Sequence, residues 1–195
     1  MASVQKMTTL LELDILEKEI AKQISDNFRN KNLDRDLENQ MLQLTFKKYK
    51  EIHKSYIELI KIGDTDTQRE ALKRALYLQW IGSFEPSHLT GIITAFDTFE
   101  KDSVGLELKD FQFVYGYLDK LIENNELDPE LLEMLSYYSC WEFIFEFANF
   151  KDFKNLHHFV FNVADTKKHW TPLIKMRELH NRGQMGDYFL SISTQ

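Results

Sequence analysis

The sequence predicts an all-α protein, a single-domain bundle of six to eight helices arranged as antiparallel hairpins. Three observations favour this class. Apolar residues recur at intervals of three and four along most of the chain, which is the helical period. Only 7 glycines and 3 prolines occur in 195 residues, whereas sheet proteins need frequent turns. Hydrophobic residues make up 43% and aromatic residues 13%, so residues 1–195 can fill one core.

Two long helices are expected before residue 63. The first spans about residues 10–28, where Thr9 and Glu12 have the spacing of a capping box. The second spans about residues 35–62 and carries two apolar stripes, so it should contact more than one neighbour. Gly63 then offers a C-terminal stop. The apolar face of the first helix is expected to comprise Leu13, Leu16, Ile20, Ile24 and Phe28.

Three further helices are expected before residue 128. The third begins after the linker at 64–67 and ends near Ser83, because Pro86 holds the residue before it out of helical geometry. The fourth spans about residues 88–99 and the fifth about residues 107–124, with a loop between them.

The sixth helix is expected to be the apolar centre of the bundle. Its start is marked by Asp128, Pro129 and Glu130, which supply a capping residue, a proline at the first helical position and an acidic first turn. The helix near residues 129–148 is apolar around most of its circumference, which predicts that it is the most buried one.

Beyond residue 150 the pattern is less regular. Residues 153–163 fit either a helix or a short strand. Thr171-Pro172 is expected to start a short helix that Gly183 ends, and residues 184–195 are expected to form a C-terminal tail. That tail is expected to dock through Tyr188, Phe189 and Leu190.

Composition favours a cytoplasmic protein. Cys140 is the single cysteine, which rules out an internal disulfide, and its apolar neighbours predict a small buried side chain. The first residues lack the uninterrupted apolar stretch of an export signal. The most apolar segment, 131–150, contains Glu133, Glu142 and Glu146, so a membrane-spanning helix is not expected.

The net charge of −7 is unevenly distributed along the chain. Residues 1–62 carry +1, residues 63–150 carry −11, from 6 basic and 17 acidic residues, and residues 151–195 carry +3. An acidic middle repels phosphate backbones, so nucleic-acid binding is disfavoured. A protein partner with a basic surface fits this charge better. A solvated acidic face that aids solubility also explains it, and for the charge alone we favour that simpler interpretation.

The segment 80–91, WIGSFEPSHLTG, is the first candidate site. It gathers the aromatic Trp80, a carboxylate, an imidazole and hydroxyls around a helix break that a proline imposes. Ser87 stands at an N-cap position, where free backbone N–H groups can face an anion. Glu85 and His88 could act as a base and its partner or bind a metal. A well-packed helix corner explains the same residues without a ligand, and we favour that structural interpretation.

Glu142 and Glu146 form the second candidate site. Their i, i+4 spacing puts both carboxylates on one face of the expected sixth helix. An inward-facing pair would need a metal, a basic ligand or a Lys/Arg partner, because unpaired buried charge is costly. An outward-facing pair would be the solvated stripe of the helix, and we favour this orientation.

Other chemistry-bearing residues match no known motif. The four histidines of the last 40 residues lack zinc-finger or His-Glu-x-x-His spacing, and His53 is expected to be a packed edge histidine. The basic run at 47–54 has acidic residues four positions on, including Glu58 after Lys54, and is expected to be a solvated face. No Walker loop, Gly-x-Gly-x-x-Gly or Gly-x-Ser-x-Gly occurs, so no cofactor or metal is expected.

The absent motifs and the charge distribution leave two classes of function open. The leading hypothesis is a non-enzymatic protein-binding or regulatory module that presents its acidic central surface to a basic protein partner. The alternative is a small-molecule- or metal-binding enzyme with a pocket at the Trp80–Gly91 corner. Its site would comprise Trp80, Glu85, Ser87 and His88, with Glu142 and Glu146.

Overall fold

The computed structural model describes residues 8–29, 34–92, 105–145, 149–163 and 178–193. Within these ranges 84% of the residues are helical and none forms a β-strand. Seven α-helices of five residues or more are present in the described part of the chain. The prediction of an all-α bundle of six to eight helices is therefore confirmed. None of these helices is long and apolar enough to cross a membrane.

The helices follow the chain in simple order. They are α1 (Leu10–Arg29), α2 (Arg35–Ile62), α3 (Thr65–Phe84), the single turn α4 (Ser87–Thr90), α5 (Leu108–Glu123), α6 (Pro129–Tyr138), α7 (Lys154–His158) and α8 (Gly183–Ser193). Short 3-10 segments span Ser139–Phe145 and Phe150–Asp152, and a π-helical turn spans Phe159–Val163.

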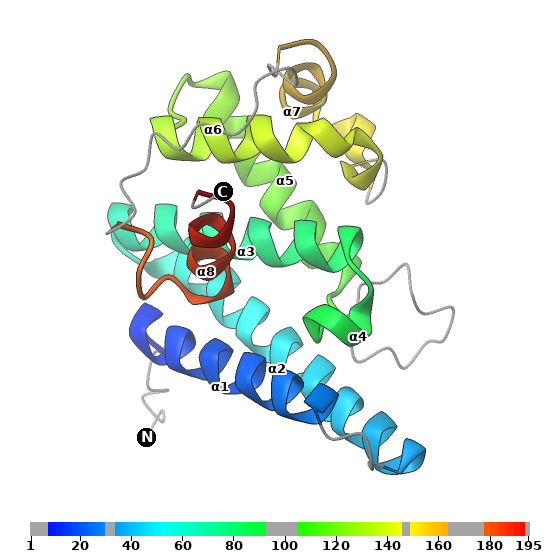
Figure 1. The fold of residues 1–195 in the computed structure, drawn as a ribbon. Helices are drawn as coiled ribbons and strands as arrows, with labels where there is room; N and C mark the ends of the chain where they lie inside the picture. The colour runs from blue at the N-terminus through cyan, green and yellow to red at the C-terminus, as the bar shows by residue number, and fades with distance from the viewer. Residues whose placement is uncertain (1–7, 30–33, 93–104, 146–148, 164–177, 194–195) are drawn as a thin grey trace, which may run out of the picture.

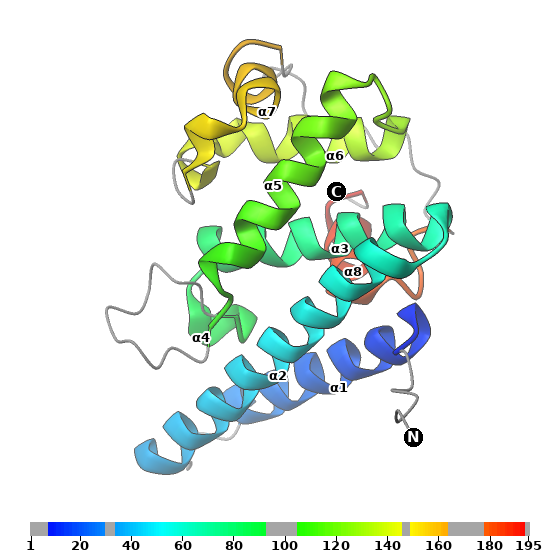
Figure 2. The ribbon, with the colours of Figure 1, turned by 180° about the vertical axis from the view of Figure 1, so that it is seen from behind.

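Helix α3 lies in the middle of the molecule. Figure 1 shows α1 and α2 below it, α6 and α7 above it, and α8 packed against its front. Seen from behind in Figure 2, α5 crosses α3 and rises toward α6. Helix α2 reverses the direction of α1, and α3 reverses that of α2, as expected for successive hairpins.

The predicted helix starts are present. Glu12 donates its backbone N–H to Thr9 Oγ1 at 3.2 Å, and Thr9 donates its own N–H to Glu12 Oε2 at 2.8 Å, which completes a capping box. Asp128 caps α6 by accepting the N–H of Leu131 at 2.9 Å, with Pro129 at the first helical position.

The prediction of the most buried helix was wrong. Every residue from Ala71 to Gly82 of α3 is buried, whereas α6 buries four of its ten residues and ends at Tyr138. The sequence of α3 includes charged residues, among them Lys73 and Arg74, so it did not look like that of a buried helix. Both of these side chains are buried in ion pairs, so charge within α3 does not mark a solvent-facing side.

Several smaller expectations need correction. Cys140 is exposed instead of buried; it lies just beyond the end of α6, in the 3-10 segment where the regular helix and its apolar face stop. His53 is fully buried, not at an edge. The fourth helix is a single turn at 87–90, and residues 93–104 lie outside the described part. Of residues 153–163, for which helix and strand were both open, all after Phe153 are helical.

The segment expected to be a C-terminal tail is helix α8, and Gly183 begins this helix. Phe189 is fully buried, while Tyr188 and Leu190 are half-buried, so docking through these three residues is confirmed. The expected short helix from Thr171 falls outside the described residues except at its end.

Candidate functional site

The first predicted site residue, Trp80, belongs to a group of eight aromatic side chains in mutual contact. Trp80 is 1% exposed and stacks on Tyr138 at a centroid distance of 4.7 Å and on Phe84 at 5.3 Å. Trp141 and Tyr188 approach the same indole at 5.6 Å and 5.4 Å. We call the whole set the aromatic cluster: Tyr77, Trp80, Phe84, Tyr137, Tyr138, Trp141, Tyr188 and Phe189.

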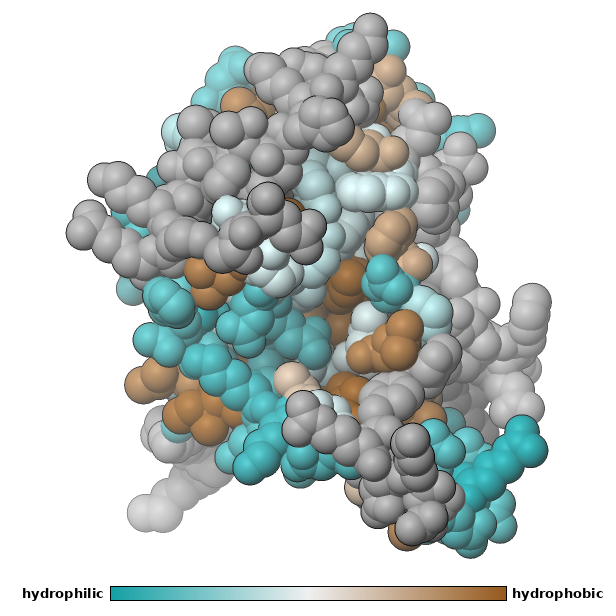
Figure 3. Space-filling model, in the orientation of Figure 1, coloured by the Kyte–Doolittle hydropathy of each residue, from teal (hydrophilic) through white to brown (hydrophobic). Residues whose placement is uncertain are grey.

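Half of the aromatic cluster reaches the surface. Phe84, Tyr137, Trp141 and Tyr188 are half-buried, and we call them the outer rings. They hold each other in place: Trp141 lies 5.0 Å from Phe84 and 5.1 Å from Tyr137, and the hydroxyls of Tyr137 and Tyr188 are hydrogen-bonded at 2.7 Å. On the face drawn in Figure 3, apolar and weakly polar residues gather between α8 and α4 along α3.

The second predicted residue, Glu85, lies at the edge of the aromatic cluster. It ends α3 and donates its backbone N–H to the carbonyl of Ile81. Its side chain is half-buried, and its charge helps to raise the pKa of Tyr188, behind desolvation and the contact with Tyr137. No ion-pair partner of Glu85 is found among the described residues.

The remaining predicted site residues are not placed. The side chains of Ser87, His88 and Glu142, and the whole of Glu146, lie outside the described residues. The structure therefore brings Trp80 and Glu85 to one cluster and tests neither the Glu142–Glu146 pair nor the role of His88.

Two polar atoms inside the aromatic cluster have no hydrogen-bond partner. They are Trp80 Nε1 and the Tyr138 hydroxyl, each buried with no acceptor or donor in reach. Buried polar groups without partners are uncommon and costly in folded proteins. The interior of the cluster is thus less stable than its apolar contacts alone imply.

A buried group of polar residues joins α2, α3 and α5. His53 Nε2 lies 3.1 Å from Gln79 Nε2, which also donates to the backbone oxygen of Asp110 at 3.3 Å. His53 Nδ1 is 3.9 Å from Asp110 Oδ2, too far for a hydrogen bond. Burial, with a smaller contribution from Lys54, lowers the pKa of His53 to about 3. A neutral imidazole without solvent access has no means of exchanging protons with a substrate.

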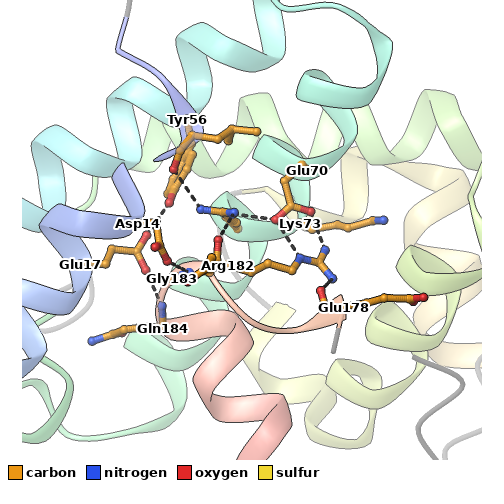
Figure 4. Close-up of polar contacts among 12 residues, drawn as sticks. Asp14, Glu17, Tyr56, Glu70, Lys73, Glu178, Arg182, Gly183 and Gln184 are labelled. Carbon is orange, nitrogen blue, oxygen red and sulfur yellow. Dashed lines mark hydrogen bonds and ion pairs between the residues drawn. The ribbon is translucent and has the colours of Figure 1, made fainter. Parts of the chain in front are cut away.

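A second polar network, absent from the sequence-based predictions, lies where α8 begins. Figure 4 shows Asp14 and Glu17 of α1 pointing at the first residues of α8. Gly183 donates its backbone N–H to Asp14 Oδ1 and Gln184 donates its own to Glu17 Oε2, both at 2.6 Å. Tyr56 donates its hydroxyl to Glu17 Oε1 at 2.5 Å.

The same network continues through Arg182, which lies one residue before α8. Its guanidinium donates to both oxygens of Glu70, at 2.9 and 2.5 Å, and to Glu130. Lys73 joins Glu130 at 2.8 Å and Asp128 at 3.0 Å. Cations of α3 and of the C-terminal segment therefore neutralise carboxylates of α3 and of the α6 start.

Part of the acidic middle is thus paired within the molecule. Glu107 contacts Lys50 at 3.1 Å, Lys54 at 2.6 Å and Lys109 at 2.6 Å, and these contacts lower its pKa to about 2. The expected pairing of Lys54 with Glu58 is replaced by this one. Among the described residues, no three His, Cys, Asp or Glu side chains are grouped to hold a metal ion.

Comparison with protein-family models, curated protein sequences and solved structures found no match.

Proposed function

We propose that the protein is a non-catalytic protein-binding module and that its outer rings contact a basic segment of a partner protein. The observation that carries the proposal is the patch itself. Phe84, Tyr137, Trp141 and Tyr188 stand half-exposed in mutual contact, beside the carboxylate of Glu85.

The chemistry of the outer rings supports this function. Tryptophan and tyrosine are the side chains that most often dominate binding energy at protein interfaces. Their rings have few rotatable bonds, so little conformational entropy is lost on binding. Here the packing on Trp80 already fixes them, which lowers this loss further.

The charge near the rings supports a basic partner. Guanidinium groups stack on tryptophan and tyrosine faces, a contact worth about 0.5–2 kcal/mol. Glu85 would then pair with the same cation. Exposed carboxylates elsewhere in the acidic middle, at Asp64, Asp66, Glu123 and Glu126, would add long-range attraction that raises the rate of association.

Compartment and partner class belong to the same proposal. We place the protein in the cytoplasm, where a lone thiol stays reduced. The excess of 31 acidic over 24 basic residues disfavours a nucleic-acid partner.

The test is binding to an array of peptides that differ in arginine, lysine and acidic content. We expect arginine-containing peptides to bind, and Trp141→Ala to weaken that binding roughly tenfold or more, as truncation of an interface hot spot does. Glu85→Gln should weaken it less and reduce its salt dependence.

Matched controls are Leu37→Ala, which removes an exposed apolar side chain of α2 (48% exposed), and Glu123→Gln, which removes an exposed carboxylate far from the rings. Neither should change the affinity. Equal losses in the controls, or no binding of any arginine peptide, contradict the proposal, as does turnover in a broad substrate screen.

A further inference from the structure

The N-terminus of α8 is held by two carboxylates of another helix. The first N–H groups of a helix have no partner within it, and here Asp14 and Glu17 of α1 accept those of Gly183 and Gln184 at 2.6 Å. Figure 4 shows both side chains reaching the same turn. Docking of α8 therefore depends on the hydrogen bonds that these two carboxylates accept.

The two carboxylates differ in how their charge is compensated. Asp14 pairs with Lys18 at 2.9 Å, and Lys18 also donates to Asn181 Oδ1 at 3.1 Å in the turn before α8. Glu17 is 2% exposed and makes no ion pair with any described residue. Ionised Glu17 thus places a charge inside the docked structure that Arg74 offsets only from a distance, behind Tyr56, which is costly.

The groups that face Glu17 come from four helices. From α1 there are Asp14 and Lys18. From α2 come the hydroxyls of Tyr56, which donates to Glu17, and Tyr49, which accepts from the side chain of Gln184. From α3 come Arg74, which hydrogen-bonds Tyr56, and Tyr77. From the α8 side comes Gln184. The other charged groups there act elsewhere: Asp187 interacts with Lys18, Asp14 and the exposed His180, and Arg182 pairs with Glu70.

Protonated Glu17 can keep both of its contacts. Oε2 accepts the N–H of Gln184 whether or not the acid is ionised. Oε1 lies 2.5 Å from the Tyr56 hydroxyl, and this hydroxyl can accept a hydrogen bond from a protonated carboxyl in place of donating one. The docked geometry therefore accommodates the neutral acid, and burial at 2% exposure favours it over the ion, while water favours the ion once α8 has left.

We propose that α8 is a proton-dependent latch: it is docked while Glu17 is neutral and loosens when Glu17 ionises. The turn before α8 supplies the pivot, because Asn181 and Gly183 both adopt left-handed backbone conformations, with φ of 60° and 63°. This inference does not depend on the proposed binding function.

Opening of the latch uncovers the inner side of the aromatic cluster. Tyr188 and Phe189 of α8 cover Tyr77 and Trp80, with ring centroids 5.4–6.4 Å apart, and Phe189 lies 6.2 Å from Tyr138. Trp80 Nε1 and the Tyr138 hydroxyl, which lack partners in the closed form, then gain access to water. These two atoms reduce the cost of opening.

The direction of the pH effect follows from proton linkage. Desolvation raises the pKa of Glu17 to about 7 in the closed form, against the lowering effect of its bonds to Tyr56 and Gln184. A raised pKa means that the closed form gains stability as pH falls, and loses it as pH rises toward 7. With 4.5 as the pKa after release, docking weakens about tenfold between pH 6 and pH 8.

The test is hydrogen exchange of the α8 amides, expressed as protection factors so that the intrinsic pH dependence of exchange cancels. Protection of residues 185–190 should fall about tenfold from pH 6 to pH 8 in the native chain. In Glu17→Gln, which keeps an acceptor for Gln184 and a donor for Tyr56, protection should not change with pH. His180→Gln and Asp187→Asn, which remove nearby titrating groups, should keep the native behaviour.

A second measurement does not depend on the variants. The carbon-13 shift of the Glu17 side-chain carboxyl should titrate with a midpoint near pH 7 in the native chain. A midpoint near 4.5, protection that is constant with pH, or an unaltered pH dependence in Glu17→Gln would overturn the latch.

Discussion

Trp80 is the residue on which the aromatic cluster depends. It contacts Tyr77, Phe84, Tyr138 and Trp141 through its ring, so its removal leaves a cavity between α3 and α6. Glu85, at the edge of the same cluster, fills no interior volume. Comparing variants of Trp80 and of Glu85 therefore distinguishes structural from binding contributions at this corner.

Trp80→Ala should destabilise the protein by about 3–5 kcal/mol, as truncation of large buried aromatics does. Glu85→Ala should change the free energy of unfolding by no more than about 0.5 kcal/mol. Urea unfolding of both variants measures these values. A loss below about 1 kcal/mol for Trp80→Ala would contradict its place in the core.

His53 makes a separate contribution that depends on pH. Its pKa is lowered to about 3 by burial, while an unfolded chain takes up the proton near 6.5. A lowered pKa of a base means that its stabilising effect is complete above pH 6.5 and is lost as pH falls toward 3.

In His53→Gln this loss should be absent. The difference in unfolding free energy between the native chain and the variant should therefore shift against the native chain by about 1.4 kcal/mol per pH unit between roughly pH 6 and 3.5. Thermal or urea unfolding across that range measures the difference. A constant difference would show that His53 is protonated in the folded state.

At the scale of elements, α8 is positioned by the turn that precedes it. Gly183 has a φ of 63°, and a Cβ added to it would lie 2.3 Å from Glu17 Oε2. Backbone conformation and close approach both require glycine here. Gly116, in α5, is a matched contrast, because a Cβ there would meet only Phe153 at 3.4 Å.

Gly183→Ala should destabilise the protein by roughly 2 kcal/mol, from left-handed strain and displacement of Glu17. Gly116→Ala should stabilise it by about 0.5–1 kcal/mol, because alanine is the better helix former. Chemical denaturation of the pair provides the comparison. Equal effects would mean that the start of α8 is not tightly packed on α1.

Arg182 ties the C-terminal segment to α3 and α6. Its side chain is 11% exposed, and it contacts Glu70 and Glu130, which are 19% and 23% exposed. Arg182→Met should destabilise the protein by about 2 kcal/mol, because two carboxylates lose their shared cation; partial solvent screening keeps this below the value for a fully buried pair.

Lys109→Ala is the control for that change, since Lys109 pairs with Glu107 while 70% exposed. It should leave stability nearly unchanged, because solvent screens an exposed ion pair. Should Arg182→Met prove as mild as this control, the polar network would contribute little to holding α8.

For the whole molecule, charge counted along the sequence differs from charge on the surface. The middle segment appeared strongly acidic, yet Glu107 is paired with Lys50 and Lys54 from α2, and Glu70 with Arg182 from the C-terminal segment. These ion pairs join the acidic middle segment to segments with a net positive charge. Part of the charge asymmetry along the sequence is therefore neutralised by contacts within the fold and does not form a binding surface.

The protonation of Glu17 and that of His53 have opposite effects on the stability of the whole molecule as pH changes. Between about pH 6.5 and 4.5 the folded state gains a proton on Glu17 while the unfolded state gains one on His53. Their effects on global unfolding offset each other in that range. Local exchange at α8 is therefore the measurement that can detect the latch.

Helix ends were predictable from sequence because local chemistry sets them. The Thr9 capping box, Asp128 with Pro129, and the stop at Gly63 all appear as expected. The fold class followed from the same periodicity.

The buried polar network was not predictable in this way. The face of α1 predicted from apolar residues included Leu16, which is 42% exposed, and omitted Glu17, which is buried. Leu13, Glu17, Ile20 and Ile24 fall at strict helical spacing on the buried face. The carboxylate of Glu17 on an apolar helix face could have indicated a buried polar contact. Its partner on α8 is 167 residues away, so the local sequence pattern could not identify it.

Recognition of a basic partner by the outer rings is the central claim, and a hydrogen-exchange footprint tests it most directly. Exchange is measured on the native chain with and without saturating arginine peptide, taken from the array. The account predicts slower exchange at residues 83–85, at 137–141 and in α8. Protection confined to residues 35–44 of α2, where Leu37 and Leu44 are exposed, would contradict it.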